Sequence, residues 1–417
     1  MAAALIAFNS LFFFGARFMK MSDLSTPAFF VDPYPVYDEM RKTGFVRFAP
    51  NLVATGRYAY VETLLQDRRL GKSYLDSVIA RYGREATAQP VFRSFASMFL
   101  MANPPAHTRA RALLNKAFNA RHVELMREIC QSTADRLVAQ LVAKRTFDLV
   151  ADYAQPLPVE IISRLLDIPV NKGIELGGAA SLMANALNSA PINAEGVAEA
   201  SAATCLLEEY FAGVIAARRE NPGEDLISAL IAAELDGDGL DENEIIANVI
   251  LLFVAGHETT SNLISNGLIA LHRNPSQLAD LRQHPALIHD AVSECLRFDT
   301  SVHVIVRSVL EEVQLDDEVL APGTNVFLML GAANRDPARF DAPDLFDIRR
   351  KDKGKLIAFG AGIHYCLGAR LAVLEIEIAL QTLLQQLPDL KLQNLDALTW
   401  RPRNNLRGVA SLLATAD

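Results

Sequence analysis

Cysteine is scarce in this chain, and the few cysteines form no recognisable pattern. Only Cys130, Cys205, Cys295 and Cys366 occur among 417 residues, and no two of them have C-x-x-C spacing. A disulfide framework and a Cys-rich zinc site are therefore excluded as the organising features of the fold. We expect a protein of a reducing compartment, the cytoplasm.

The chain also lacks the sequence features that separate domains or attract nucleic acid. No Ser/Gly/Pro-rich linker and no internal repeat interrupts it, and its net charge of -9 argues against nucleic acid as the main partner. Hydrophobic residues make up 51% of the chain and charged residues 21%, which is typical of a globular protein with a large core. We expect one continuous domain over residues 21–417.

The N-terminal segment has no apolar run long enough to cross a membrane. Residues 2–16 are mostly apolar, but Asn9 and Ser10 interrupt them, and a span needs roughly 20 residues. No positive charge precedes the run, as a secretory signal would require. We expect residues 1–20 to be an extension of the domain, with Met21 as an alternative start, and a membrane contact is not expected. A weak contact of this segment with a membrane surface is the alternative.

Most of the remaining sequence has the periodicity of helices, and strands are few and short. This predicts a mainly α protein with a small β-sheet region. Helical spacing of apolar residues occurs near 35–41, 105–118, 123–144, 159–166, 194–220, 225–234, 241–273, 285–298 and 366–384. Strands are predicted at 45–48, 52–55, 304–309, 325–329 and 409–413.

The segment 241–273 is unusually long for a single helix. Asp241 and Glu244 have capping-box spacing, and a helix of this length would measure ~50 Å. Its middle, residues 255–260, reads Ala-Gly-His-Glu-Thr-Thr, which weakens helix propensity at the centre. Such a weakness suits a ligand site that has a small-residue gap, a carboxylate and a hydroxyl. The alternative is a kinked core helix in which Thr259 bonds back to its own helix.

Residues 359–368, Phe-Gly-Ala-Gly-Ile-His-Tyr-Cys-Leu-Gly, look like a cysteine ligand presented to a large flat cofactor. Gly360 and Gly362 let the loop bend closely beneath a ring system, and Gly368 leaves room for its face. Cys366 lies just before a predicted helix, where the helix dipole and free N–H groups are expected to lower the pKa of its thiol. The alternative is a buried free cysteine on a Gly-rich turn.

Two further groups of charged residues have helical spacing. Glu294 and Arg297 have the i,i+3 spacing of an ordinary surface pair, which is the alternative here. Because their neighbours are apolar, we expect a buried pair, with Arg350 as a further partner. His107 and Arg111, which follow Pro104 and Pro105, are on one helix face and could grip carboxylates or could be solvated.

Taken together, these motifs resemble the haem-thiolate cytochrome P-450 family in its soluble bacterial form. They are F-G-x-G-x-H-x-C-x-G at 359–368, A-G-x-E-T at 255–259, E-x-x-R at 294–297, P-D-x-F-D at 343–347 and the Pro-Pro-x-His-Thr-x-x-Arg spacing at 104–111. The resemblance covers roughly residues 27 to 413 and implies the P-450 fold, with a long central helix over haem b (iron protoporphyrin IX).

The resemblance also implies roles for the matching residues. Cys366 would be the axial thiolate of the haem iron, and Glu258 and Thr259 would deliver protons to dioxygen. Glu294, Arg297 and Arg350 would form a structural network behind the haem. The other cofactor-binding residues would be His107, Arg111, Ala255, Arg307, Phe359, Gly360, Gly362, His364 and Gly368, with His107, Arg111, Arg307 and His364 on the haem propionates.

For the substrate, the resemblance implies an apolar pocket and the oxygenation of a lipophilic small molecule, such as a lipid, a terpenoid or another secondary metabolite. The pocket residues would be Phe92, Phe95, Met98, Phe99, Val254, Val302, Val304, Ile305 and Leu406.

Electrons would come from NAD(P)H indirectly, through a ferredoxin or flavodoxin system. Residues 349–355 hold five cations and one anion, so they are either a docking surface for an acidic partner or a solvated turn. Two other functions stay open. One is a peroxide-driven or isomerising haem-thiolate enzyme, and the other is a non-catalytic haem-binding sensor.

Overall fold

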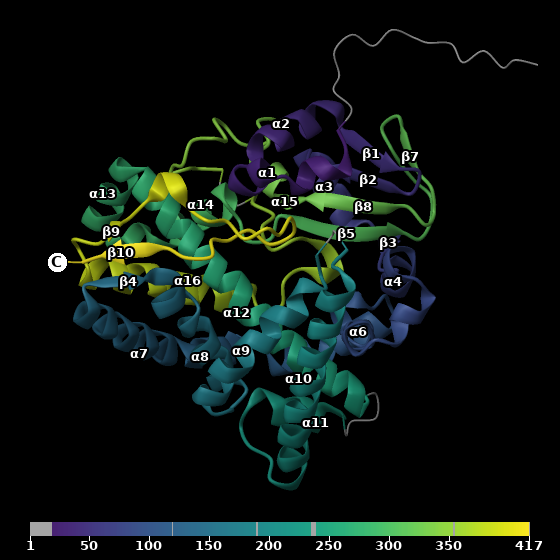
Figure 1. Ribbon diagram of the computed structural model, residues 1–417, viewed down its shortest axis with the longest axis horizontal. Coiled ribbons are helices and arrows are strands. Elements are labelled where there is room, and N and C mark those ends of the chain that lie inside the picture. Colours follow the sequence, from purple (N-terminus) through teal and green to yellow (C-terminus); the bar gives the residue numbers. More distant parts are fainter. Residues whose placement is uncertain (1–18, 119, 189–190, 235–238, 353–354, 417) are drawn as a thin grey trace, which may run out of the picture.

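The computed structural model describes residues 19–118, 120–188, 191–234, 239–352 and 355–416. Helices dominate these ranges, and the short strands lie in separate sheets at two opposite sides of the molecule (Figure 1). The predicted fold class is therefore confirmed. Residues 1–18, which make up most of the predicted N-terminal extension, lie outside the described residues, so that extension stays a prediction.

The helices that the sequence predicts are present, with shifts of a few residues at their ends. They are α2 (Tyr34–Thr43), α6 (Ala106–Ala117), α7 (Ala120–Lys144), α8 (Pro156–Leu165), α10 (Ala194–Glu220), α11 (Leu226–Glu234), α12 (Glu242–Arg273), α14 (Ile288–Phe298) and α16 (Ala369–Gln386). The sequence analysis missed α1 (Pro27–Val31), α3 (Tyr58–Gln66), α4 (Tyr74–Tyr82), α5 (Pro90–Ala96), α9 (Val170–Asn185), α13 (Pro275–Gln283) and α15 (Leu330–Ala333).

The missed helix α9 shows why propensity alone fails here. It contains three glycines, which lower helix propensity by roughly 1 kcal/mol each relative to alanine. One of them, Gly173, packs so closely on α8 that a Cβ atom would lie 1.9 Å from the Ser163 hydroxyl oxygen. Close packing between α8 and α9 therefore favours glycine where local propensity disfavours it.

The larger sheet has five strands in the order β1-β2-β8-β5-β3. Its strands are β1 (Phe45–Ala49), β2 (Leu52–Thr55), β3 (Leu70–Gly71), β5 (Val304–Val309) and β8 (Asn325–Met329). β2 and β8 are parallel and the other pairs are antiparallel. This sheet places Arg307 of β5 next to the segment that follows β3.

The smaller sheets are β4-β10-β9 and β6-β7. Their strands are β4 (Thr146–Asp148), β6 (Val313–Leu315), β7 (Glu318–Leu320), β9 (Lys391–Leu392) and β10 (Leu413–Thr415). The strand predicted at 409–413 lies further along the chain, at 413–415, where it pairs with β4 and β9. Val409 makes only an isolated bridge to Trp400.

Helix α12 runs through the core and packs against α8, α10, α14 and α16 (Figure 1). It begins with the predicted capping box, since Asp241 accepts the Glu244 N–H at 2.8 Å and Glu244 accepts the Asp241 N–H at 3.0 Å. Most of its residues between Ile245 and Leu271 are buried. Burial of each large apolar side chain stabilises the fold by roughly 1.5 to 3 kcal/mol.

In the described ranges, one helix has the length and composition of a membrane span, α10. Within the fold this helix packs against α9, α5 and α12.

Candidate active site

The cysteine loop has the bent backbone that its glycines predict. Gly360 and Gly362 adopt φ angles of 69° and 70°, and a Cβ atom on Gly362 would lie 2.3 Å from the Leu65 carbonyl oxygen. The Cys366 N–H donates to the Phe359 carbonyl at 3.1 Å. No atom lies within 4 Å of a Cβ position on Gly368, so the end of the loop borders open space.

Cys366 is partly exposed and lies three residues before α16. Burial raises the pKa of its thiol, although the backbone N–H of Gly368 and the Arg111 guanidinium act in the opposite direction. The predicted lowering of this pKa is therefore wrong for the protein groups alone, because desolvation outweighs the helix terminus. A metal ion bound to the sulfur would supply the charge that keeps it deprotonated.

One stripe near the middle of α12 is open, although most residues between Ile245 and Leu271 are buried. Ala255 is exposed and Leu252, Gly256 and Thr259 are partly exposed. These residues have the i, i+3, i+4, i+7 spacing of a single helix face. The Thr259 hydroxyl donates to the Ala255 carbonyl at 2.9 Å. The back-bonded geometry considered as the alternative is thus present, and it lies on a face that borders open space.

Glu258 is buried and does not contact Thr259 among the hydrogen bonds of the described residues. Its carboxylate forms an ion pair with Arg403, and the Arg401 guanidinium lies 3.6 Å from the same oxygen. The other oxygen, Oε2, is buried without a hydrogen-bond partner. Sequence reasoning missed both arginines, because they follow the recognised motifs by more than 30 residues and belong to none of them.

Basic side chains from three separate segments gather beside the cysteine loop. His107 and Arg111 come from α6, Arg307 from β5 and His364 from the loop itself, and the two imidazole rings are 4.3 Å apart. All four imidazole nitrogens are buried without a hydrogen-bond partner. The structure therefore brings together the four residues that the sequence predicts to bind carboxylates.

Lys72 is a fifth basic group of this cluster, and the sequence analysis missed it. Its ammonium donates to the Val306 carbonyl at 3.1 Å, and burial followed by the charge of Arg307 lowers its pKa well below the usual value. Asn103 holds the Lys72 backbone through two hydrogen bonds of 2.7 Å. Little in the sequence indicates this role for Lys72, because a lysine that follows a two-residue strand belongs to no recognisable motif.

Five basic side chains form this basic cluster: Lys72, His107, Arg111, Arg307 and His364. Their positive charges repel one another. Burial lowers the pKa of His364 to about 2 and that of His107 to about 4, and the neighbouring cations add to both effects. In the described part of the chain, no ion pair involves any of the five residues. Such a cluster is complementary to a ligand with carboxylates, since buried cations need partners.

These features fit haem b, which carries two propionates on a flat ring. The basic cluster could bind the propionates, the Cys366 sulfur could ligate the iron, and Ala255 and Gly368 border space that side chains do not fill. The orphaned nitrogens of His107 and His364 would then find acceptors.

The predicted pocket wall is only partly open. Val302, Ile305 and Leu406 are partly exposed, and Val302 pairs with Leu406 as a β-bridge. Phe92, Phe95 and Met98 have no exposed surface, so they do not line open space in this structure. The remaining predicted wall residues, Phe99, Val254 and Val304, are also buried. Contact of these buried residues with a substrate stays a prediction.

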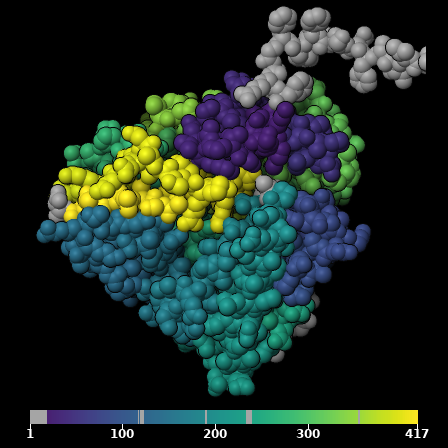
Figure 2. All heavy atoms as spheres, viewed as in Figure 1, coloured from purple at the N-terminus to yellow at the C-terminus, as the bar shows by residue number. Residues whose placement is uncertain are grey.

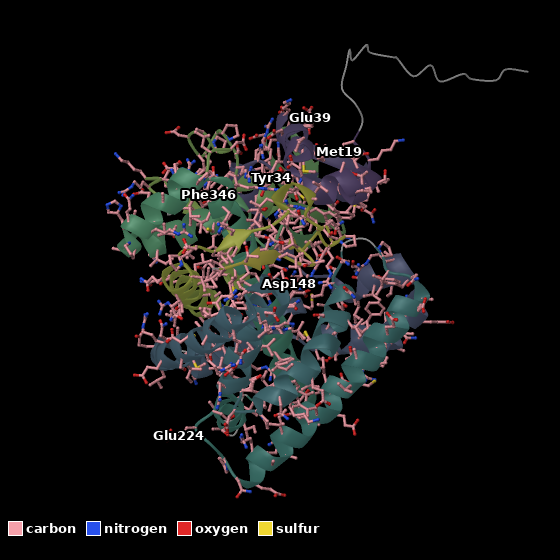
Figure 3. All side chains as sticks on the ribbon, turned by 60° about the vertical axis from the view of Figure 1, so that its left-hand side comes forward. Met19, Tyr34, Glu39, Asp148, Glu224 and Phe346 are labelled. Carbon is pink, nitrogen blue, oxygen red and sulfur yellow. The ribbon has the colours of Figure 1, made fainter. Side chains whose placement is uncertain are left out.

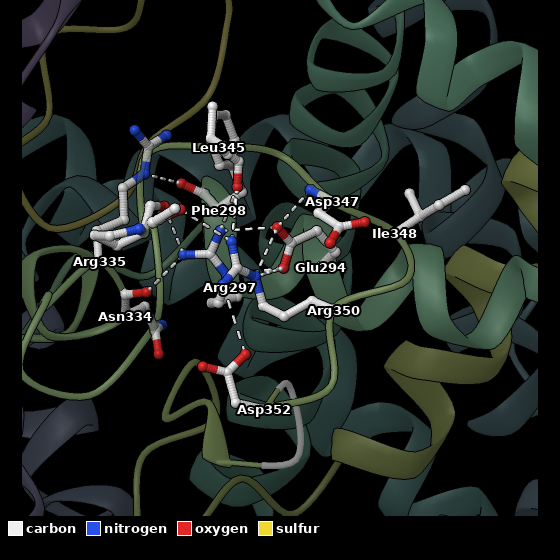
Figure 4. A network of polar contacts seen from close by, with 12 residues as sticks. Glu294, Arg297, Phe298, Asn334, Arg335, Leu345, Asp347, Ile348, Arg350 and Asp352 are labelled. Carbon is white, nitrogen blue, oxygen red and sulfur yellow. Dashed lines mark hydrogen bonds and ion pairs between the residues drawn. The ribbon is translucent and has the colours of Figure 1, made fainter.

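The buried pair of α14 has the third partner that the sequence predicts (Figure 4). Arg297 donates to both oxygens of Glu294 at 2.7 and 2.8 Å, and Arg350 lies 3.3 Å from the same carboxylate. The Asp347 N–H donates to Glu294 at 2.9 Å. Arg297 also donates to the carbonyls of Asn334, Pro343 and Leu345. The network joins α14 to the segment before the cysteine loop.

The basic segment 349–355 is less open than its composition predicts. Arg349 pairs with Asp280 at 2.6 Å, and Arg350 is buried against Glu294. Lys351 and Lys355 are exposed, whereas Lys353 lies outside the described residues. Two of its five cations therefore serve intramolecular contacts.

Comparisons with known proteins agree with this site. Residues 198–397 match the family model described as Cytochrome P450. The chain is 49% identical to cytochrome P450 133B2 of Xylella fastidiosa, over 95% of this chain and 99% of that protein. It is 40% identical to cytochrome P450 107B1 of Saccharopolyspora erythraea, over 85% and 87% of the two chains.

A solved relative has the same fold. The structure of P450BioI in complex with hexadec-9Z-enoic acid ligated acyl carrier protein matches with a TM-score of 0.87 and 32% identity, over 94% of this chain and 100% of that one. The chain therefore belongs to the cytochrome P450 family of haem-dependent monooxygenases.

Proposed function

We propose that this enzyme inserts one oxygen atom of O₂ into a lipophilic small molecule, by hydroxylation or epoxidation, with Cys366 as the axial ligand of haem b. The observation that carries the proposal is the basic cluster beside the cysteine loop, which lacks acidic partners in the described ranges; His107 and Arg307 are buried and its other members are partly exposed. Haem would complete such a site, because its propionates would pair with the basic cluster and its iron would bind the sulfur that Cys366 offers.

Each part of the chain has a separate task in this proposal. Lys72, His107, Arg111, Arg307 and His364 hold the propionates, and Gly360 and Gly362 let the loop approach the ring while Phe359 covers the sulfur. Ala255 leaves room on the oxygen side. Glu294, Arg297 and Arg350 keep the segment before the loop in place.

Bound haem supplies the oxidation of substrate by O₂, which consumes two electrons and two protons and releases one water. Proton supply is the task of the chain itself, and Glu258 and Thr259 are the groups we assign to it. The Thr259 hydroxyl lies on the open stripe of α12 and can bind and orient water there. Positioned proton transfer of this kind contributes about 10² to 10⁴ in rate.

The proposed substrate is a lipid, a terpenoid or another secondary metabolite. The partly exposed wall residues Val302, Ile305 and Leu406 are apolar, which favours a ligand held by few polar contacts. The acyl-loaded carrier protein bound to the relative P450BioI supports a substrate of this kind.

We propose that electrons reach the site from NAD(P)H through a ferredoxin or flavodoxin. Ile363 and Tyr365 of the cysteine loop are 43% and 46% exposed, and the cations Lys351, Lys355 and Arg370 are exposed as well. A mixed apolar and basic surface suits an acidic partner. The enzyme would act in the cytoplasm with this partner.

The docking proposal is tested by charge reversal. K351E and K355E together should slow electron transfer from an acidic ferredoxin, most strongly at low ionic strength, and leave carbon monoxide binding unchanged. K42E is the control, because Lys42 is exposed on α2. Equal rates for K351E/K355E and the wild type would rule this surface out.

The oxygenation itself is tested with isotopically labelled oxygen. Ligands are first selected by the spin-state shift that they cause, and the enzyme then turns over with NADH, a ferredoxin and its reductase under ¹⁸O₂. The proposal expects one ¹⁸O atom in the product and one in water. Product formation that needs peroxide and no reductase would favour the peroxide-driven alternative, and binding without any turnover would favour a sensor.

A further inference from the structure

A cleft lies on the surface between helices α13, α14 and α16. Its floor is apolar and is formed by Leu281 of α13, Ile288 at the start of α14 and Leu384 of α16. Leu281 and Leu384 are only 3% and 6% exposed, whereas Pro285 and Pro388 are exposed at the rim. The volume of the cleft is about 230 Å³. Sites for drug-sized ligands enclose roughly 300 to 1,000 Å³, so this cleft fits a smaller molecule.

Three polar side chains border the same cleft. They are Arg282 of α13, which is exposed, and Gln381 and Gln385 of α16. In the described part of the chain, none of these three side chains forms a hydrogen bond or an ion pair. The acid nearest to Arg282 on α13 is Asp280, which already pairs with Arg349. An arginine fork and two amide donors beside an apolar floor are complementary to a carboxylate that carries an apolar chain.

The cleft is remote from the haem site. Gln381 lies ~18 Å along α16 from Ala369, the first residue of this helix, and Cys366 precedes that residue. Helix α13 lies at the left edge of the molecule in Figure 1, whereas α4 lies at the right edge. Figure 2 shows the side around α13 as a green surface above the yellow C-terminal residues. A ligand in this cleft is therefore distinct from a substrate bound at the haem.

The helices around the cleft also hold the segment that precedes the cysteine loop. Gln277 of α13 accepts the Ile348 N–H at 2.9 Å. Phe298 of α14 packs on Phe346, which is labelled in Figure 3, with ring centroids 5.3 Å apart. A ligand that contacts both α13 and α16 would thus stabilise helices on which the cysteine loop depends.

We propose that this cleft is a second binding site of the enzyme and that it takes a small amphipathic carboxylate, such as a medium-chain fatty acid. The Arg282 guanidinium and the amides of Gln381 and Gln385 bind the carboxylate, and the apolar chain covers the leucine and isoleucine side chains of the floor. The bound ligand joins α13 to α16. Binding involves no covalent step, and the site does not depend on the proposed oxygenation.

The first test is calorimetric titration of the haem-loaded enzyme with decanoate. A bulky azole that ligates the haem iron is present at saturation, so that the haem site is blocked. We expect one decanoate to bind per chain and to raise the melting temperature. R282E should weaken binding at least about tenfold, because the charge-assisted hydrogen bonds to the carboxylate are lost. Decan-1-ol should bind more weakly by a similar factor, since it carries no charge.

Two further variants separate recognition of the carboxylate from general effects. R84E changes the net charge by the same amount, and Arg84 is exposed between α4 and α5, so decanoate affinity should stay the same. I288W should abolish binding, because a larger side chain fills the cleft while every charge is kept. Equal affinity in wild type and R282E, or an equal loss in R84E, would overturn the proposal.

The azole also reports on the haem site itself. Its spectrum with the haem iron should be the same in wild type, R282E, R84E and I288W, which shows that each variant is folded. A wild type without an azole spectrum would contradict the proposed function and leave the decanoate result to be read by itself.

The second test locates the ligand with a decanoate analogue that carries a photoreactive diazirine at the end of its chain. After irradiation and proteolysis, the label should be found in peptides that contain Ile288 or Leu384, and excess decanoate or R282E should prevent it. Label confined to other peptides would rule the cleft out. If R282E leaves decanoate binding unchanged but slows electron transfer from an acidic ferredoxin, the cleft is a protein interface and the proposal is wrong.

Discussion

Loss of the Glu294 carboxylate should destabilise the fold unusually strongly, because it would leave buried arginines without their counter-charge. Its carboxylate balances Arg297, whose side chain is fully buried, and Arg350, whose side chain is 6% exposed. Glu294→Gln removes the negative charge but keeps an acceptor for the Asp347 N–H. Breaking a buried ion pair from one side costs about 3 to 5 kcal/mol, because a charge is left without its partner. We expect the lower value, about 3 kcal/mol.

A matched control exists at the same spacing. Glu39 and Lys42 also form an i,i+3 pair, on α2, but their side chains are 66% and 68% exposed. Glu39→Gln should change the free energy of unfolding by less than about 0.5 kcal/mol, since water screens the pair. The two sites differ in burial and in the number of partners, since Glu294 also contacts Arg350 and the Asp347 N–H.

The assay is urea unfolding of the haem-loaded enzyme at 25 °C, followed by far-UV circular dichroism. Glu294→Ala should cost about 1 kcal/mol more than Glu294→Gln, because it also leaves the Asp347 N–H without its acceptor. A loss below about 1 kcal/mol for Glu294→Gln, or an equal loss for Glu39→Gln, would refute the reasoning.

Three further predictions concern the haem side and the oxygen side of the site. Lys72→Met should speed haem transfer to apomyoglobin by about tenfold, because a charge-assisted hydrogen bond to a propionate is lost, whereas Lys42→Met should leave the rate unchanged. Thr259→Ala should lower product formation by about 100-fold and raise peroxide release, and Thr259→Ser should retain coupling; full coupling in Thr259→Ala would contradict the assigned role. The melting temperature of the haem-free protein should fall as the pH is lowered from 6.5 to about 4. The pKa of His107 is about 4 in the folded protein and 6.5 in the unfolded chain, so between these values only the unfolded chain takes up the proton. His107→Gln should weaken this pH dependence, and an unchanged profile would show that His107 does not cause it.

The sequence could predict the long periodic helices and four strands of the larger sheet, since the predictions at 45–48, 52–55, 304–309 and 325–329 correspond to β1, β2, β5 and β8. The capping box of Asp241 and Glu244 and the apolar run behind it define α12 locally, so its predicted start was off by one residue and its predicted end, residue 273, was correct. Helix α9 could not be predicted in the same way, because its glycines make sense only against α8. The two-residue strands β3 and β9 depend on partners far away in the sequence.

The residues of the candidate site also differ in whether a local sequence pattern indicates them. Cys366, His364, His107 and Arg111 stand in motifs whose spacing carries the chemistry, so the sequence could indicate them. Lys72 and Arg403 have no local pattern, and only the fold brings them to Arg307 and Glu258. The pKa of Cys366 was misjudged for a related reason, since the helix terminus is visible in the sequence but the degree of burial is not.

The central claim is that Cys366 supplies a thiolate ligand to bound haem. Its most direct test is the carbon monoxide difference spectrum of the reduced enzyme, with Cys366→His as the control. We expect the wild type to show the red-shifted Soret band of thiolate-ligated haem, and Cys366→His to bind haem but lack that band. A wild type without the band, or the same band in Cys366→His, would contradict the account.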